Sequence, residues 1–161
     1  MILHAGLLAL FDAGAWRGVL VEGPSGAGKS DLALRALDCG FQLVADDRVL
    51  IWATGGVLYG RAPEPLADLL EVRGLGVLPQ PARPFCRIDL LVRAGEPERL
   101  PEPEAAERLG VALPVAVLAL REASAPAKLR RALQHLGAGP EGAYQARRVA
   151  RTLNGPGGDS H

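Results

Sequence analysis

The first part of the chain is built from apolar runs separated by glycine. Residues 2–10 and 18–22 are largely apolar, and runs of this length predict two buried strands. Gly14 and Gly18 fall at or between these runs, so residues 11–18 are expected to form the loop that joins the two strands. The chain is therefore predicted to begin with strands.

The period of the pattern changes after residue 30. Apolar residues now recur at helical spacing, at Leu32, Ala33, Ala36 and Leu37, and Gly40 supplies a natural stop. A strand, a glycine-rich segment and an amphipathic helix thus follow one another.

The remaining elements are predicted from short apolar runs and from prolines and glycines. In chain order they are a buried strand at 42–45, a hairpin of 49–52 and 57–59 around Gly55 and Gly56, a short helix through 63–70, a loop at 79–84, a strand at 88–92, an exposed linker at 95–104, a strand at 115–120, and helices at 127–136 and 142–153. Strands that alternate with helices predict an α/β fold, a mixed sheet with flanking helices. We expect one domain over residues 1–153 and a glycine-rich, disordered tail at 154–161.

Charge and composition exclude several classes of function. Lysine plus arginine equals aspartate plus glutamate, 18 of each, and a neutral chain argues against a general nucleic-acid binder. Aromatic residues make up only 4%, which disfavours a base-stacking surface. No apolar run approaches the roughly 20 residues of a membrane helix, so we expect no membrane partner and a cytoplasmic location. The two cysteines and three histidines lack zinc-ligand spacing.

The segment between the second strand and the first helix is a complete phosphate-binding motif. It reads Gly23, Pro24, Ser25, Gly26, Ala27, Gly28, Lys29, Ser30, which matches G-x-x-x-x-G-K-[ST] in full. Its glycines let backbone N–H groups point at phosphate oxygens, Lys29 places a positive charge on the β and γ phosphates, and the Ser30 hydroxyl suits magnesium. The following helix directs its positive dipole end at the anion. The motif predicts a P-loop that binds ATP or a related donor together with Mg²⁺.

Two acidic residues follow the next predicted strand. Asp46 and Asp47 come directly after the apolar run 42–45. If that strand runs parallel to the strand that leads into the P-loop, both carboxylates lie at the same edge of the sheet as the phosphates. One of them could bind the metal, and the other could take a proton from an attacking hydroxyl.

These residues together resemble the HPr kinase/phosphorylase family, a group of bifunctional bacterial enzymes. The similar segments are His4, the P-loop at 23–30, Leu-Val-Ala-Asp-Asp-Arg-Val at 43–49 and Leu-Leu-Glu-Val-Arg-Gly-Leu-Gly-Val at 69–77. The resemblance is to the C-terminal catalytic domain, and residues 122–128 look like the short alphaproteobacterial members. It implies the fold class of HPr kinase and PEP carboxykinase.

The resemblance also implies an activity and site roles. The activity is ATP-dependent phosphorylation of a serine of HPr or a related phosphocarrier, and family members also reverse this reaction with inorganic phosphate. By position, Asp47 corresponds to the base, His4 to the catalytic-site histidine and Asp46 to its acidic neighbour. Lys29 and Ser30 would hold phosphates and metal, and Glu71 would be a further magnesium ligand.

Two features of the family have no clear counterpart in the sequence. For the basic loop linked to dephosphorylation, Arg121 and Lys128 are the candidates. The C-terminal helices that hold longer members as hexamers are not recognisable, so a homo-oligomer is left open. Arg73 could meet phosphate or anchor its own loop.

Two other functions remain as alternatives. A P-loop kinase for a small molecule would need a deep apolar pocket with few polar groups, whereas a protein substrate suits a shallow, exposed cleft. A non-catalytic nucleotide sensor would bind ATP with Asp47 unable to reach a substrate hydroxyl.

Overall fold

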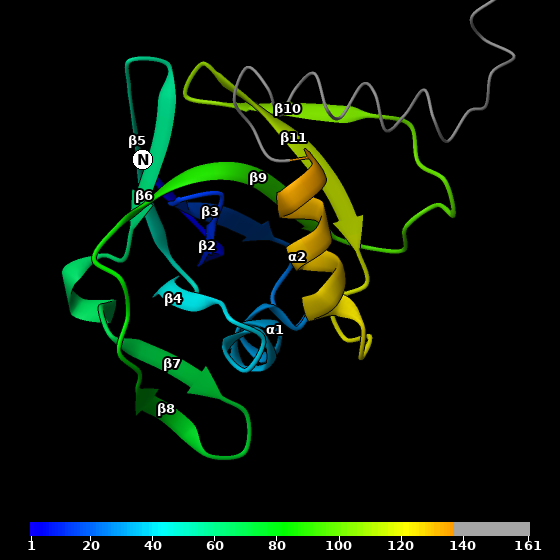
Figure 1. Cartoon of the computed structure of the whole chain (residues 1–161). Helices are drawn as coiled ribbons and strands as arrows, with labels where there is room; N and C mark the ends of the chain where they lie inside the picture. The colour runs from blue at the N-terminus through cyan, green and yellow to red at the C-terminus, as the bar shows by residue number, and fades with distance from the viewer. Residues whose placement is uncertain (137–161) are drawn as a thin grey trace, which may run out of the picture.

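The computed structural model describes residues 1–136 and shows a mixed sheet with two helices packed on it (Figure 1). Its elements in chain order are β1 (Ile2–Leu3), β2 (Ala5–Asp12), β3 (Ala15–Glu22), α1 (Lys29–Leu37), β4 (Gln42–Ala45), β5 (Val49–Thr54), β6 (Val57–Arg61), the 3-10 helix η1 (Glu64–Leu66), β7 (Leu69–Val72), β8 (Gly76–Pro79), β9 (Cys86–Ala94), β10 (Glu104–Arg108), β11 (Val111–Leu118) and α2 (Ala125–Leu136). The predicted α/β fold class is confirmed. The predicted helix at 142–153 and the tail at 154–161 lie outside the described residues.

Nine strands form one sheet, and a separate pair forms a hairpin. The main path is β1-β5-β6-β9-β3-β2-β4, and β11, which carries β10 on its other side, also pairs with β9. β3, β9 and β11 run parallel to one another. β4 pairs antiparallel with β2, and β2 pairs antiparallel with β3, so β4 points the same way as β3. The expectation that the acidic strand end and the P-loop share an edge is thereby confirmed.

The first two long strands form a tight hairpin instead of being joined by a loop. The prediction of a loop at 11–18 is wrong, because the β2–β3 ladder continues to the pair Asp12↔Ala15. Ala13 and Gly14 both have positive φ, 50° and 81°, as a two-residue hairpin turn requires. Phe11 and Trp16 pack edge to face across the ladder with ring centroids 5.5 Å apart, which stabilises the extension.

Residues 63–79 also differ from the prediction. The expected helix through 63–70 is only the 3-10 turn η1, because the backbone is already extended at Ala67 (φ −64°, ψ 142°) and left-handed at Asp68 (φ 57°). The chain then continues into the β7–β8 hairpin, a two-stranded sheet that lies apart from the main sheet (Figure 1). Leu70 of β7 is buried in the core, whereas Leu75 at the turn is 72% exposed.

Besides β7 and β8, strand β10 is absent from the predicted elements. β10 is an edge strand with polar Glu104, Glu107 and Arg108, so it carries little of the apolar signal by which strands are recognised. Its partner β11 begins at Val111 and not at residue 115, although Pro114 breaks the apolar pattern. β9 pairs with β11 only from Val115 onward, so the proline lies where one side of the strand has no ladder.

The other predicted elements are confirmed. The strand at 42–45, the hairpin around Gly55 and Gly56, helix α1, the central strand β9 and helix α2 all appear at or within a few residues of the expected positions. Neither helix in residues 1–136 is long and apolar enough to cross a membrane.

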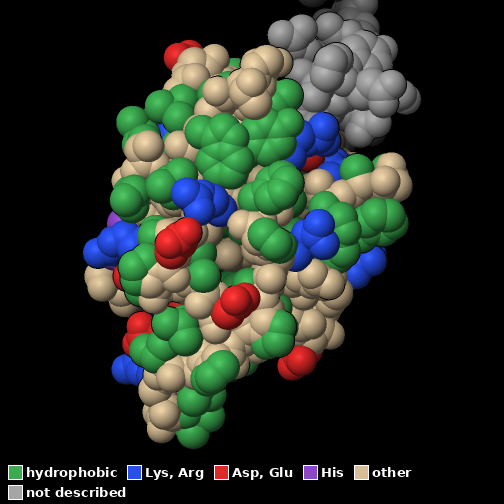
Figure 2. Space-filling model, turned by 90° about the vertical axis from the view of Figure 1, so that its left-hand side faces the viewer, with side chains coloured by type: hydrophobic (Ala, Val, Ile, Leu, Met, Phe, Trp, Pro, Cys, Tyr) green, Lys and Arg blue, Asp and Glu red, His purple; other side chains and the backbone are tan. Residues whose placement is uncertain are grey.

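The sheet is buried on both faces by two apolar clusters. Leu8, Leu10, Val19 and Val21 face α1 and α2, while Leu7 and Leu20 point to the opposite side, as the two-residue period of a strand dictates. On that opposite side β5 and β6 curl over the sheet (Figure 1). Figure 2 views the molecule from this side, where hydrophobic side chains gather among single charged residues. Trp52 of β5 and Tyr59 of β6 stack on each other as cross-strand neighbours. Central strands fixed on both faces give the loops at their ends a rigid base.

Candidate active site

The P-loop joins β3 to α1, and its backbone conformation and close packing require glycine at several positions. Gly26 and Gly28 have φ of 83° and 102°, a region that side chains rarely adopt. At Gly23 a Cβ would lie 2.7 Å from the Cβ of Ala94, so β3 and β9 can approach closely only with glycine there. Gly28 is also the N-cap of α1, whose free backbone N–H groups and dipole open onto the same loop.

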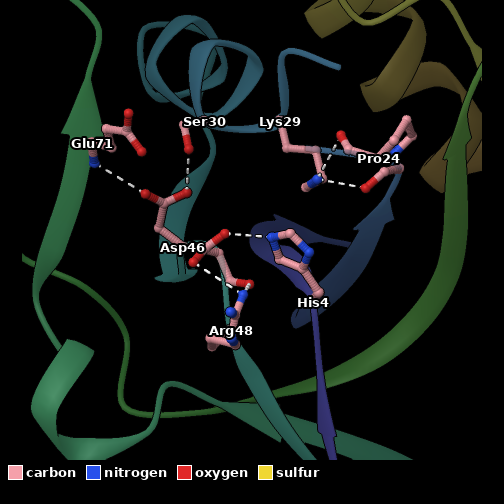
Figure 3. A network of polar contacts seen from close by, with 9 residues as sticks. His4, Pro24, Lys29, Ser30, Asp46, Arg48 and Glu71 are labelled. Atoms are coloured by element: carbon pink, nitrogen blue, oxygen red, sulfur yellow. Dashed lines mark hydrogen bonds and ion pairs between the residues drawn. The ribbon is translucent and has the colours of Figure 1, made fainter. Parts of the chain in front are cut away.

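Lys29 lies across this loop. Its ammonium donates hydrogen bonds to the carbonyl oxygens of Gly23 and Pro24, the latter at 3.1 Å (Figure 3). These bonds hold the lysine side chain over the mouth of the P-loop, where its charge faces any phosphate bound by the backbone N–H groups. The strand before the loop is held as well. Arg108 of β10 donates two hydrogen bonds to Glu22, at 3.1 and 2.6 Å, and this contact raises the pKa of Arg108 above its usual value.

Asp46 is the structural carboxylate of the pair. It is 8% exposed, and its two oxygens accept hydrogen bonds from the Ser30 hydroxyl at 2.8 Å and the Glu71 backbone N–H at 3.0 Å (Figure 3). It therefore ties together three elements, β4, α1 and β7. The Glu71 side chain points toward Ser30 from the β7 side, so all three oxygen-bearing side chains converge (Figure 3).

Asp47 has the opposite environment. Its side chain is 53% exposed and lies 2.6 Å from the Nε2 of His4, whose side chain is 44% exposed. Arg48 contacts the other carboxylate oxygen at 3.1 Å. Asp47 adopts φ 66°, a left-handed conformation that turns its side chain away from the direction of Asp46. One residue is thus buried for support, while the next is presented to solvent at functional distance from a histidine.

The expected pairing of His4 is corrected by this geometry. Asp46 was expected as the acidic neighbour of His4, but the carboxylate that His4 contacts belongs to Asp47. Asp46 is occupied by Ser30 and Glu71 instead. The reason is the left-handed turn at Asp47, which sends the two consecutive side chains to different sides of the backbone.

These groups line one open cleft of about 570 Å³. His4, Lys29, Ser30, Asp47 and Glu71 all line it, so the structure brings together five residues from four separate parts of the sequence. Asp46 lies directly behind the cleft wall.

Two arginines join the cleft from loops. Arg73 lines it from the β7–β8 turn. Arg121 follows β11, lines the cleft and donates a hydrogen bond to the Gly26 carbonyl oxygen. Lys128, the other candidate for a basic loop, pairs with Glu122 at 2.8 Å and is not among the lining residues. The sequence holds no motif that marks Arg121, since its contact is made 95 residues away along the chain.

The side chains of the cleft supply only part of the ligand shell that a magnesium ion needs. Residues 1–136 contain no group of three His, Cys, Asp or Glu side chains placed to hold a metal. The hydroxyl of Ser30 and the carboxylates of Asp46 and Glu71 are, however, all oxygen ligands of the kind that Mg²⁺ prefers. Magnesium commonly takes one or two protein ligands and completes its shell with water and phosphate oxygens. The donor set therefore fits Mg²⁺ bound jointly with phosphates.

A comparison with protein families decides the family of the chain. The family model described as HPr serine kinase C-terminal domain matches residues 1–82 of the 161. The chain belongs to this family. The matched residues include every cleft residue considered so far except Arg121.

Individual members of the HPr kinase family are similar to this chain over 62–79 residues. The HPr kinase/phosphorylase of Stenotrophomonas maltophilia (strain K279a) is 48% identical over 79 residues, which cover 48% of this chain and 24% of that protein. That of Bordetella pertussis is 55% identical over 62 residues, 38% of this chain and 20% of the relative. The chain thus matches about a quarter or less of the length of these curated relatives.

A solved structure extends the likeness beyond the matched residues. The HPr(Ser) kinase/phosphatase of Coxiella burnetii superposes with a TM-score of 0.70 at 22% sequence identity, and the match covers 83% of this chain and 94% of that one. At this identity the likeness concerns the fold. It shows that the HPr kinase fold includes the second part of the chain, although the family model stops at residue 82.

Proposed function

We propose that the chain is the catalytic part of an ATP-dependent protein serine kinase whose substrate is HPr or a similar phosphocarrier. The observation that carries this proposal is the exposed Asp47 carboxylate, held 2.6 Å from His4 in the same cleft as the P-loop lysine. The substrate assignment is supported by relatives named HPr kinase/phosphorylase, which are 48% identical over 79 residues and 55% identical over 62 residues.

The residues of the P-loop would bind and align the phosphates. Backbone N–H groups of residues 25–30 and the Lys29 ammonium hold the donor, and the α1 dipole adds to the attraction. Ser30 and Glu71, with Asp46 behind them, would hold Mg²⁺. Magnesium, when bound, supplies positive charge that offsets the charge developing on the phosphate oxygens.

Asp47 would act as the general base. It accepts the proton of the substrate serine hydroxyl as the serine oxygen forms a bond to the terminal phosphorus and the bond from that phosphorus to ADP breaks. With a proton on Nε2, His4 donates to Asp47 and fixes the orientation of the carboxylate. In the phosphorolysis reaction an oxygen of inorganic phosphate would bond to the phosphorus of phosphoserine as the bond from that phosphorus to the serine oxygen breaks; pyrophosphate would leave, and protonated Asp47 would give its proton to the serine oxygen. Arg121 is the candidate cation for this phosphorolysis because it lines the cleft, whereas Lys128 does not.

The shape of the cleft favours a protein substrate over a small molecule. A small-molecule kinase would need an enclosed apolar pocket around Asp47. Here the side chains of Asp47 and His4 are about half exposed and the surrounding walls are charged. The same exposure argues against a pure nucleotide sensor, because a serine on the surface of another protein can reach Asp47. We further propose that the protein acts in the cytoplasm.

A phosphotransfer assay tests the proposal. Purified protein is incubated with γ-labelled ATP, magnesium and an HPr protein, with a serine-to-alanine HPr variant as the control. We expect label on the serine protein and none on the alanine variant, and excess inorganic phosphate should then remove the label. Binding of ATP without any labelling of HPr would contradict the kinase proposal.

A further inference from the structure

Arg35 of α1 takes no part in the proposed chemistry, yet each of its three guanidinium nitrogens donates a hydrogen bond. Its Nε donates to the Asp31 carboxylate at 2.9 Å, four residues earlier on the same helix. One terminal nitrogen donates to the carbonyl oxygen of Glu122 at 2.9 Å, and the other donates to that of Leu120. The helix that follows the P-loop is thus bound to the loop after β11, which lies 85 residues further along the chain.

The two carbonyl groups belong to the residues on either side of Arg121. A guanidinium is a planar fork with fixed N–H directions, so it orients two acceptors more strictly than a single donor could. The loop is also closed on itself, because the Glu122 N–H donates to the Ala119 carbonyl oxygen at 3.1 Å, and it is anchored by the Leu120 side chain, which is 2% exposed. The backbone that carries Arg121 is therefore held from both sides.

The Arg121 side chain returns from this loop to the P-loop. Its guanidinium donates a hydrogen bond to the Gly26 carbonyl oxygen. Its aliphatic part lies against Gly28, where an added Cβ would be only 3.1 Å from the Cγ of Arg121. Because α1 starts directly after Gly28, these contacts form a closed ring. The P-loop leads into α1, Arg35 of α1 binds the loop after β11, and Arg121 of that loop binds the P-loop.

We propose that Arg35 is a positioning residue that acts on the phosphate site through Arg121. A long, exposed side chain loses rotamer freedom when it is held in one place, and a loop that moves would add to this cost. By fixing the loop, Arg35 lowers the cost and keeps Arg121 beside the P-loop before phosphate arrives. The inference rests on the proposed function only in taking the ligand of the P-loop to be ATP.

A second arginine provides a matched control. Arg130 of α2 also donates a hydrogen bond to a backbone carbonyl oxygen, that of Cys39 just after α1, at 3.1 Å. Both arginine side chains are half-buried, and both join α1 to the last part of the described chain. Only Arg35, however, binds the carbonyl groups that flank Arg121. A general loss of helix packing would therefore affect both variants, whereas a loss of Arg121 placement would affect one.

A double-mutant cycle on the binding of ATP with magnesium tests the proposal. Dissociation constants are measured by titration calorimetry for the unaltered protein, Arg35→Ala, Arg121→Ala and the double variant. We expect Arg35→Ala to weaken ATP by about two- to fivefold, as for loss of Arg121 itself. The double variant should bind no more weakly than Arg121→Ala, since both changes remove the same contribution. Arg130→Ala should leave the dissociation constant unchanged.

Additive losses in the double variant, or unchanged ATP affinity in Arg35→Ala, would overturn the proposal. Arg35→Lys keeps the charge but not the fork, so it should lose as much affinity as Arg35→Ala, and full affinity would assign the effect to charge alone and refute the positioning role.

A spectroscopic measurement on Arg35→Lys covers the case that Arg35→Ala does not fold. The amide of Ala27 shares a peptide group with the Gly26 carbonyl, so its NMR signal reports the Arg121 contact. The signal should shift in the same direction in Arg35→Lys and Arg121→Ala and stay in place in Arg130→Ala. An unshifted signal in Arg35→Lys would refute the proposal. Failure of the kinase proposal would appear separately, as the expected binding cycle without transfer to HPr.

Discussion

The two sides of the P-loop differ in almost every physical respect. On the β4 side lie charged and hydrogen-bonding groups, with Asp46 and Asp47 on consecutive residues. On the β9–β11 side lies a second cavity of about 320 Å³, and its walls are formed mainly by small apolar residues such as Ala94 and Ala119. Apart from Arg121, the residues of the first side lie in the segment matched by the family model, whereas the second side combines the P-loop with loops after β9 and β11 that lie beyond residue 82. Under the proposed function, the groups for proton and phosphoryl transfer therefore lie on the β4 side of the P-loop.

The largest effect is expected from Asp47→Asn. Removing the carboxylate charge removes the proton acceptor, and general bases contribute roughly 10²–10⁴-fold to rate. We expect kcat for HPr phosphorylation to fall by about 10³-fold while the Kd for ATP stays within about twofold. Asparagine keeps the size of the side chain and tolerates the left-handed backbone.

The control for this variant is Asp38→Asn, which changes an exposed aspartate at the end of α1. It should leave kcat unchanged. Full activity of Asp47→Asn would show that Asp47 is not the base. The β4 side would then lack the proposed proton acceptor.

Lys29→Ala should affect both steps, because the ammonium meets phosphates in the ground state and in the transition state. A hydrogen bond to a charged group contributes about 1.5–3 kcal/mol, so the Kd for ATP should rise by about 10- to 100-fold, and kcat should fall as well. Isothermal titration and the phosphotransfer assay report the two effects. Lys128→Ala is a matched control, since these are the two lysines of the chain. Unchanged ATP affinity in Lys29→Ala would require a new assignment for this residue.

His4→Gln should have a smaller effect, confined to turnover. His4 is a positioning residue for Asp47, and loss of one orienting hydrogen bond worth about 1 kcal/mol lowers kcat by about five- to tenfold. The KM for ATP should not change, because His4 lies on the acceptor side of the cleft. His135→Gln, an exposed change on α2, provides the comparison. A rise in the KM for ATP with constant kcat would assign His4 to donor binding. The β4 side would then not be confined to proton and phosphoryl transfer.

The smallest effect is expected from Arg121→Ala. The arginine is exposed and supports the P-loop through the Gly26 carbonyl, so its loss should weaken ATP by only about two- to fivefold, in line with a single solvent-screened contact. Arg131→Ala on an exposed face of α2 should have no effect. A fall of several hundredfold in kcat for HPr phosphorylation would show that Arg121 takes part in the forward transfer and not only in phosphorolysis, and the groups for forward transfer would then not be confined to the β4 side.

The β4 side could be predicted from the sequence largely because its groups are written as local motifs. Residues 23–30 form one motif, and Asp46 and Asp47 directly follow a strand that was expected to reach the same edge of the sheet on condition that it ran parallel to the strand before the P-loop. The roles of His4 and Glu71 were suggested only by the family resemblance. What no pattern indicated was which of the two aspartates meets His4, because that depends on a single backbone conformation at Asp47.

The β9–β11 side could not be predicted for a different reason. Its cavity is assembled from loops near residues 24, 95 and 120, each of which looks like an ordinary turn in the sequence. β10 escaped prediction because an exposed edge strand needs no apolar alternation. The β7–β8 hairpin was mistaken in part for helix because prolines at 63 and 65 also suit a helical start. Contacts between distant segments have no periodic signature in the chain.

The left-handed backbone at Asp47 has an energetic consequence for the whole fold. A residue other than glycine at positive φ costs on the order of 1 kcal/mol, although aspartate and asparagine tolerate it best. Replacement by glycine would relieve this cost, so the unfolding free energy would rise or stay level while catalysis is lost. Position 47 is therefore a place where stability and activity oppose each other, and a search for thermostable variants that ignores activity would tend to select proteins that fold well and transfer nothing.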